Sequence, residues 1–115
     1  MSTQTAVLNK ADLEAKFFQA LSDPNRLSML RYLLDGEKSV TEIAAAVGMS
    51  QSCISNHLAC LRNCHFVSVR QDGRKAYYSL RYADISDIIR LGEKLVRAHA
   101  EEVARCTGCL EEQAV

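Results

Sequence analysis

Five cysteines are the residues of this 115-residue chain whose spacing is best suited to chemistry. Cys60 and Cys64 are four apart in a segment of helical periodicity, so both sulfurs should project from one face. Cys106 and Cys109 form a Cys-x-x-Cys pair near the carboxyl end, with a glycine between them that lets the chain turn. Thiolates select soft or borderline ions such as cadmium, lead, zinc, copper(I) or arsenic(III). The spacing predicts that Cys60, Cys64 and one or both terminal cysteines bind one soft metal ion.

Three other interpretations of the cysteines stay open. Cys53 has no partner at good spacing near the start of its helix, so it is interpreted either as a structural residue that packs as a small hydrophobe or as a bystander on the DNA-facing side. Either pair could instead form a disulfide and serve as a thiol redox sensor, which requires exposed thiols of low pKa. A static zinc-stabilised interaction module is the third possibility, and such a module would unfold when the metal is removed.

A second set of residues is suited to DNA. Short polar and amide side chains begin the segment that carries the first cysteine pair, and such groups can enter a major groove. Two basic residues lie near an expected hairpin tip, where they fit phosphate or minor-groove contact. The residues expected to contact DNA are Gln51, Ser52, Ser55, Asn56, His57, Arg74 and Lys75.

The charge distribution supports a local DNA-binding face. The chain has 14 Lys+Arg and 14 Asp+Glu residues, so it is not a generally basic nucleic-acid binder. Residues 50–83, however, carry five basic groups against one acidic group, a net charge of +4. A basic third within a neutral protein indicates a localised anion-binding surface.

The elements that position these residues follow from periodicity and capping signals. A helix is expected over about Asn9–Leu21, and Asp23-Pro24 is typical of an N-cap followed by proline at the first helical position. Ser39 and Glu42 have capping-box spacing before a short helix that ends near Gly48. A helix over about Gln51–Cys64 follows after a tight turn, which is the helix-turn-helix pattern.

The apolar period then changes from 3.6 to 2. Phe66–Arg70 and Ala76–Leu80 are expected strands, with Asp72-Gly73 as the turn, so a hairpin wing follows the helix-turn-helix. A last helix over about Ala83–Arg105 has a broad apolar stripe, which favours burial both in its own domain and against a second copy. The predicted fold is mainly α (α+β), a winged helix-turn-helix of order αααα-ββ-α. Residues 1–115 form one such domain, with a C-terminal dimerisation helix and a short tail.

Several classes of protein are disfavoured. A hydrophobic fraction of 48% excludes a disordered chain. No apolar run approaches the roughly 20 residues that cross a bilayer, and Met1-Ser2-Thr3-Gln4 does not resemble a secretory signal. A cytoplasmic protein with reduced thiols is therefore expected. No phosphate loop and no paired acid and base residues are present, so an enzyme is not expected.

Four blocks of the chain resemble the ArsR/SmtB family of bacterial metal-responsive repressors, in order and in spacing. They are Leu21-Ser22-Asp23-Pro24-Asn25-Arg26-Leu27, Val40-Thr41-Glu42-Ile43-Ala44, Ser50-Gln51-Ser52-Cys53-Ile54-Ser55-Asn56-His57-Leu58 and Asp72-Gly73-Arg74-Lys75-Ala76-Tyr77-Tyr78. The resemblance covers about residues 15–105. It implies a homodimer built from the first and last helices, which binds double-stranded operator DNA without metal and is released when metal binds.

The family has several sensor patterns, and one is present here. The Cys-x-Cys pattern before the recognition helix is missing. The zinc-type pattern keeps His99 and Glu102 but lacks its upstream histidine. Leu58-Ala59-Cys60-Leu61-Arg62-Asn63-Cys64 resembles the cadmium- and lead-sensing CmtR-type members, which also use a C-terminal cysteine. The resemblance implies Cys60, Cys64 and Cys106 as ligands, with Cys109 as an extra thiol, and Cd(II) or Pb(II) as the inducer. Zn(II) and As(III) are alternatives.

Overall fold

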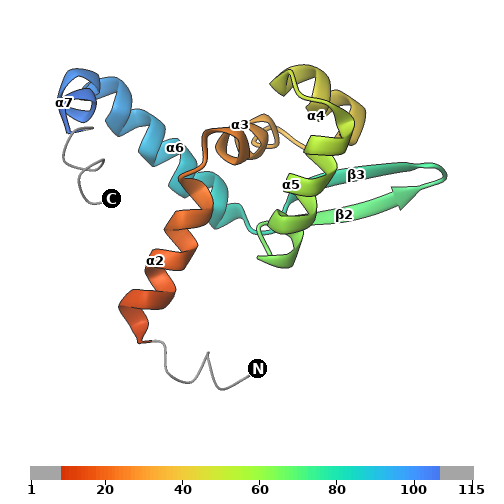
Figure 1. Cartoon of the computed structure of the whole chain (residues 1–115), viewed down its shortest axis with the longest axis horizontal. Helices are drawn as coiled ribbons and strands as arrows, with labels where there is room; N and C mark the ends of the chain where they lie inside the picture. Colours follow the sequence, from red (N-terminus) through yellow and green to blue (C-terminus); the bar gives the residue numbers. More distant parts are fainter. Residues whose placement is uncertain (1–8, 107–115) are drawn as a thin grey trace. The chain divides into compact units, whose positions relative to one another are not determined.

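The computed structural model describes residues 9–106 and divides into two compact units, residues 1–82 and 83–115. The first unit contains α2 (Lys10–Leu21), α3 (Pro24–Tyr32), β1 (Lys38–Ser39), α4 (Val40–Val47), α5 (Gln51–Asn63), β2 (Val67–Asp72) and β3 (Lys75–Leu80). The second unit contains α6 (Ala83–Ala98) and α7 (Ala100–Arg105) (Figure 1). The predicted winged helix-turn-helix is confirmed, with a short third strand, β1, that the sequence pattern did not reveal.

The helices of the first unit begin at polar capping residues, and the caps at Asp23 and Ser39 are those that the sequence predicted. Each N-cap side chain accepts a hydrogen bond from a backbone N–H three residues further on, and the four caps are Asn9, Asp23, Ser39 and Ser50. At α4 the capping box is complete, because the Ser39 N–H also donates to Glu42 Oε1 at 2.9 Å. Gly48 then ends α4 in the left-handed region at a φ of 79°.

The end of α5 is a Schellman motif built on a residue other than glycine. His65 has a φ of 64°, its N–H donates to the Arg62 carbonyl at 3.0 Å, and the Phe66 N–H donates to the Leu61 carbonyl at 2.9 Å. Leu61 and Phe66 are both buried, which gives the hydrophobic contact that accompanies this motif. The motif turns the chain from the recognition helix directly into β2.

A His65→Gly variant should be more stable than the wild-type protein. The left-handed conformation costs an L-residue roughly 1–2 kcal/mol, and glycine adopts it freely. Glycine has more conformational freedom in the unfolded chain, and this opposes part of the stabilisation. We therefore expect a net rise of about 0.5 kcal/mol or more in the free energy of unfolding. Urea denaturation measures this quantity. His65→Ala keeps the strain and serves as the control, and a glycine variant no more stable than the alanine variant would contradict the strain.

One face of α5 anchors the recognition helix in the core. Ile54, Leu58 and Leu61 are essentially inaccessible to solvent, and the helix packs against α4 and β2. The remaining core side chains come from the neighbouring elements and are Met29, Leu30, Leu33, Ile43, Ala44, Phe66 and Val67. Because this side of α5 is fixed, its other faces are presented outward in a defined orientation.

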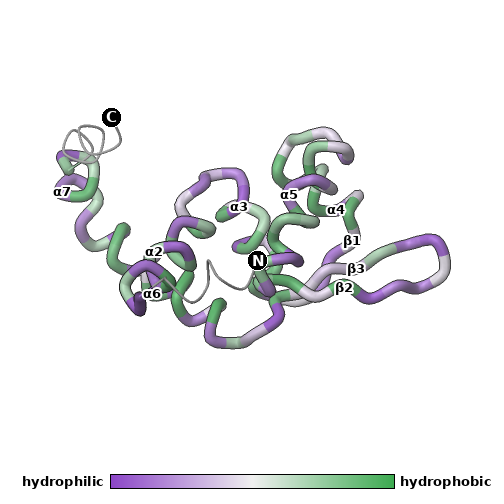
Figure 2. Tube along the Cα trace, turned by 60° about the horizontal axis from the view of Figure 1, so that its bottom comes forward, coloured by the Kyte–Doolittle hydropathy of each residue, from purple (hydrophilic) through white to green (hydrophobic). Residues whose placement is uncertain are grey.

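The wing is a three-stranded antiparallel sheet of order β1-β3-β2. Asp72 pairs with Lys75, so the two-residue loop is Gly73-Arg74, one position later than the Asp72-Gly73 turn expected from the sequence. Gly73 has a φ of 64° and Arg74 has no positive φ, which is the pattern of a type II′ turn with glycine first. The far end of the hairpin is hydrophilic (Figure 2).

An ion pair ties the wing to the segment before β1. The Arg70 guanidinium donates to both carboxylate oxygens of Glu37, at 2.6 and 3.2 Å, and lies 4.8 Å from the centroid of the Tyr77 ring. This contact lowers the pKa of Glu37 below its ordinary value. The forked geometry restrains the direction in which the hairpin leaves the unit.

The second unit corrects one prediction. The sequence favoured one helix over Ala83–Arg105, but the structure interrupts it at His99, whose φ of −133° and ψ of 38° are not helical. The interruption lets α7 begin anew with Glu101 and Glu102 in its first turn, where carboxylates interact favourably with the helix dipole. In the described part of the chain, no helix is both long and apolar enough to cross a membrane.

Candidate nucleic-acid groove and thiol pair

An open groove of about 280 Å³ lies where the recognition helix, the start of α4 and the wing tip meet. Four of the seven residues expected to contact DNA line it: Gln51 and Ser55 from α5, and Arg74 and Lys75 from the hairpin. The two pairs are far apart in the sequence, and the pairing of β1 with β3 brings the hairpin beside α4. The groove therefore combines side chains of the types that can read bases with side chains of the types that can bind phosphate.

The other expected contacts differ in their position. Ser52 and Asn56 are exposed on α5 but do not line the groove, and His57 is half-buried. Thr41, at the start of α4, also lines the groove. The sequence did not identify it as a DNA-contacting residue, because its segment showed only a capping box and a family motif. The Thr41 hydroxyl could be recognised as a groove residue only once the pairing of β1 with β3 was known to bring the basic hairpin tip beside α4.

The groove has an unneutralised positive side. Within residues 9–106, neither Arg74 nor Lys75 has a carboxylate within ion-pair distance. The nearby Glu42 is held by its capping bonds to Ser39, which lower its pKa most, with a smaller contribution from Lys75. The two cations at the wing tip are free to bind phosphate.

The first cysteine pair lies at the opposite end of α5. Cys60 is in the last turn and Cys64 is the C-cap, and the Cys64 N–H donates to the Cys60 carbonyl at 3.0 Å. Both side chains are exposed and neither is in a disulfide. Partial burial raises the pKa of the Cys64 thiol most, and the neighbouring Cys60 raises it further. The spacing of four along α5 places both side chains on one face of the helix, as expected.

Cys64 should react more slowly with iodoacetamide than a free cysteine does at the same pH. The thiolate is the reactive form, and a raised pKa lowers its fraction across the range below that pKa. Peptide mapping by mass spectrometry after timed alkylation of the reduced, metal-free protein measures the rate for each cysteine. In a Cys60→Ser variant the rate at Cys64 should increase, because the neighbouring thiol is gone. An unchanged rate would mean that the two thiols do not interact.

The remaining predicted ligands are not tested by the structure. Cys106 belongs to the second unit and is exposed, and Cys109 lies outside the described residues. In residues 9–106, no group of three or more His, Cys, Asp and Glu side chains is assembled as a metal site. Cys53 is exposed rather than packed in the core, which removes the structural interpretation and leaves it as a bystander on the surface of α5. His99 lies 3.5 Å from Glu102, so this remnant of the zinc-type pattern forms a local contact.

A recognition helix held on a hydrophobic core, with a basic wing tip beside its first turn, defines a winged helix-turn-helix DNA-binding protein. Residues 23–69 match the family described as bacterial regulatory proteins of the arsR family. The chain belongs to this ArsR/SmtB family of transcriptional regulators, and it is therefore not an enzyme.

Individual relatives make the membership more specific. A probable mercury resistance operon repressor from Streptomyces lividans is 36% identical over 93% of this chain and 86% of its own length. The regulator CmtR from Mycobacterium bovis is 42% identical, but over only 57% of this chain and 56% of its own length. The sequence prediction placed the chain closest to CmtR-type members, whereas the mercury repressor aligns over much more of it.

A solved structure gives the fold of a dimeric relative. The homodimeric winged helix-turn-helix domain of Mb0332 from Mycobacterium bovis has a TM-score of 0.73 and 28% identity to this chain. The match covers 89% of this chain and 92% of that domain. The winged helix-turn-helix class is therefore shared over nearly all of both chains.

Proposed function

We propose that the chain is a homodimeric repressor that binds operator DNA in its metal-free form and releases it when Cys60, Cys64 and Cys106 bind a thiophilic ion. The observation that carries this proposal is the position of the thiol pair on the recognition helix itself. Two exposed thiols lie at the C-terminal end of α5, while Gln51 and Ser55 nearer its N-terminal end line the groove. Two exposed, adjacent thiols suit a soft ion and offer little to Mg²⁺ or Ca²⁺.

Several ions are candidates for the inducer. The similarity of the Cys60–Cys64 segment to cadmium- and lead-sensing members favours Cd(II) or Pb(II). The extensive alignment with a mercury resistance repressor favours Hg(II), which is also thiophilic. Zn(II) and As(III) accept thiolates as well. Cys109 is available as a further ligand.

A dimer is supported by apolar side chains that each unit leaves exposed. In the second unit, Leu91 and Leu95 are about 60% exposed, and Val96 and Val103 about 50%. In the first unit, Leu13 and Phe18 on α2 are similarly exposed. Apolar surface of this kind usually marks an interface. The homodimeric relative supports a pairing of two copies.

The mechanism follows from the rigidity of α5. Its buried face fixes the helix on the core, so groups at its two ends move together. Cys60, Cys64 and Cys106 would together hold a thiophilic ion, which would supply a link between the last turn of α5 and the C-terminal end of the chain. This link would constrain the helix and change the alignment of Gln51 and Ser55 with bases. DNA must weaken metal binding by the same factor by which metal weakens DNA binding. A tenfold effect requires only about 1.4 kcal/mol of differential binding.

Absorption titrations test the proposal directly. Thiolate-to-metal charge-transfer bands would be followed as Hg(II), Cd(II), Pb(II) and Zn(II) are added to the wild-type protein and to each Cys→Ser variant. We expect one ion per protomer, with the band weakened in the Cys60, Cys64 and Cys106 variants and unchanged for Cys53→Ser. A band that survives in both Cys60→Ser and Cys64→Ser would exclude this site.

The spacing of two exposed thiols at the C-terminal end of α5 favours a redox sensor as a second function. Cys60 and Cys64 could form a disulfide, in which two thiols lose two protons and two electrons while hydrogen peroxide is reduced to two waters. A metal-free, chelator-treated protein would then release DNA on addition of peroxide and recover with dithiothreitol. Release by metal but not by peroxide would leave only the metal-responsive function.

A further inference from the structure

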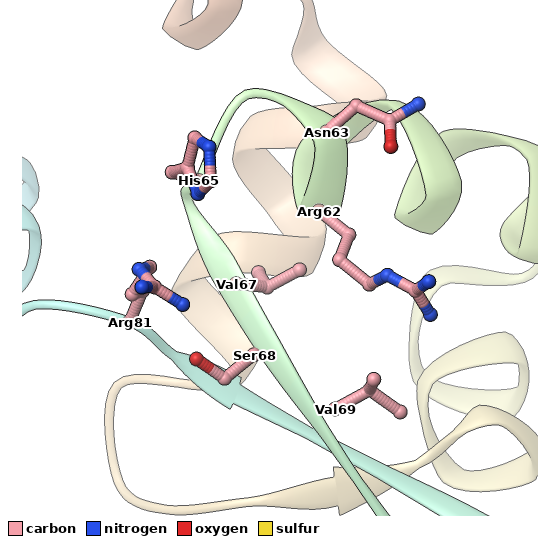
Figure 3. A pocket seen from close by; sticks show the side chains of 7 residues that line it. All are labelled: Arg62, Asn63, His65, Val67, Ser68, Val69 and Arg81. Carbon is pink, nitrogen blue, oxygen red and sulfur yellow. The ribbon is translucent and has the colours of Figure 1, made fainter.

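A second depression lies at the other end of the wing, apart from the DNA groove. It has a volume of about 470 Å³ and shares no lining residue with that groove. Its lining is Arg62, Asn63, His65, Val67, Ser68, Val69 and Arg81, which includes two guanidinium groups and no carboxylate (Figure 3). We propose that this depression binds a small polyanion that carries at least two separated negative charges, and we call it the polyanion pocket.

The two arginines of the polyanion pocket lack acidic partners. Arg62 is exposed and makes no ion pair with any residue between 9 and 106. Arg81 donates to the Tyr82 hydroxyl at 3.1 Å and lies 5.5 Å from the centroid of that ring, so its charge is also left unneutralised by the described carboxylates. A guanidinium binds carboxylate or phosphate through two parallel N–H donors. Each arginine can therefore bind one anionic group.

The position of the arginines determines the kind of ligand. β2 is an edge strand, and the polyanion pocket surrounds its first residues. In Figure 3, Arg62 and Val69 lie on one side of β2, while Ser68 and Arg81 lie on the other side. A ligand that uses both guanidinium groups must reach across the strand edge. An anion with two charged groups on a short frame meets this requirement, and a single acetate-like group does not.

The groups between the arginines complement such a ligand. Asn63 and Ser68 supply an amide and a hydroxyl, and the two valines supply an apolar surface for a carbon frame. An edge strand also leaves alternate backbone N–H groups without a strand partner. The volume is in the range typical of sites for small organic ligands.

The polyanion pocket is placed to influence the recognition helix. Arg62 and Asn63 lie between Cys60 and Cys64 in the sequence, and Arg62 is two residues from each, so it points away from the face that carries the thiols. A ligand bound there would contact the last turn of α5 from the side opposite to the thiol pair. The polyanion pocket would thus give the regulator a second small-molecule input.

Titration of the reduced, metal-free, full-length protein with citrate and with pyrophosphate tests the proposal. Amide resonances would be followed by nuclear magnetic resonance at constant ionic strength. Dithiothreitol keeps the thiols reduced without adding carboxylates, and acetate is the single-charge control. We expect saturable shifts at Val67, Ser68 and Val69 with both polyanions, and none with acetate. Shifts that are equally large with acetate, or missing with both polyanions, would overturn the proposal.

Charge-removing variants locate the binding. Arg62→Gln and Arg81→Gln should each weaken the citrate affinity about tenfold, because each removes a charge-assisted contact. Both residues are exposed, so folding should be retained, and circular dichroism checks this. Arg74→Gln, at the wing tip, should leave the citrate affinity unchanged. If the first two variants weaken DNA binding and not citrate binding, the occupant is the DNA backbone and the proposal is wrong.

Discussion

Cys60→Ser should give a repressor that still binds DNA but no longer releases it at ordinary concentrations of the inducing ion. Serine is nearly isosteric with cysteine, and Cys60 is exposed and does not line the groove, so the DNA affinity of the metal-free protein should change by less than about twofold. The ion concentration that releases half of the DNA should rise about a hundredfold, because a thiolate ligand is replaced by a hydroxyl that binds soft ions poorly. Fluorescence anisotropy of a labelled duplex, chosen by selection from random DNA, measures both quantities.

Cys53→Ser is the matched control for this prediction. Cys53 is exposed on the same helix, but it is seven residues from Cys60 and outside the thiol pair. Its replacement should leave metal-induced release unchanged, while Cys64→Ser should reproduce the loss seen with Cys60→Ser. Normal release by both Cys60→Ser and Cys64→Ser would show that the inducer binds elsewhere in the chain.

The architecture was predictable from the sequence where local signals determine it. The N-caps at Asp23, Ser39 and Ser50 and the left-handed Gly48 are short-range features, and each helix begins or ends where its signal stands. The spacing of Cys60 and Cys64 belongs to the same class, because residues four apart on a helix share a face whatever surrounds them. The part of the candidate site that the sequence specifies by itself is therefore the part that lies on one helix.

Features that depend on pairing or on competing interactions were not predictable. β1 has only two residues and exists because Lys38 and Ser39 pair with Tyr78 and Tyr77, so no period-2 pattern could indicate it. The helix is interrupted at His99, but neither proline nor glycine occurs there, so no local sequence signal indicated the interruption. The place of Thr41 in the groove also depends on the wing, which brings its tip to the start of α4.

The structure assigns different surfaces of α5 to different chemical tasks. Its apolar stripe is buried, its first turn lines a groove with a basic wing tip, and its last turn carries two exposed thiols. In the proposed function, the thiols and the groove residues lie on the same helix, so binding at one end would act directly on the other. A ligand that binds at the C-terminal turn need only shift one rigid helix to change the geometry at the N-terminal turn.

The double variant Arg74→Gln, Lys75→Gln should lose most of the affinity for DNA at physiological salt. Both side chains line the groove and have no carboxylate partner among the described residues, so they can bind phosphate without first breaking an ion pair. Charge-assisted hydrogen bonds of this kind contribute roughly 1.5–3 kcal/mol each, so we expect the affinity to fall about a hundredfold or more. The dependence of affinity on salt should also weaken, by roughly 0.9 in the log–log slope for each phosphate that the variant no longer neutralises.

Lys10→Gln, Lys16→Gln is the control, because it removes the same charge from α2, which does not line the groove. Its DNA affinity and salt slope should stay close to those of the wild-type protein if the wing tip binds phosphate directly. Equally weakened binding in the two double variants would mean that only the overall charge of the protein attracts DNA. A wing-tip variant with weaker affinity but an unchanged slope would mean that these side chains position the hairpin rather than contact the backbone. Direct phosphate contact requires that affinity and slope fall together in the wing-tip variant alone, since counterion release accompanies each neutralised phosphate.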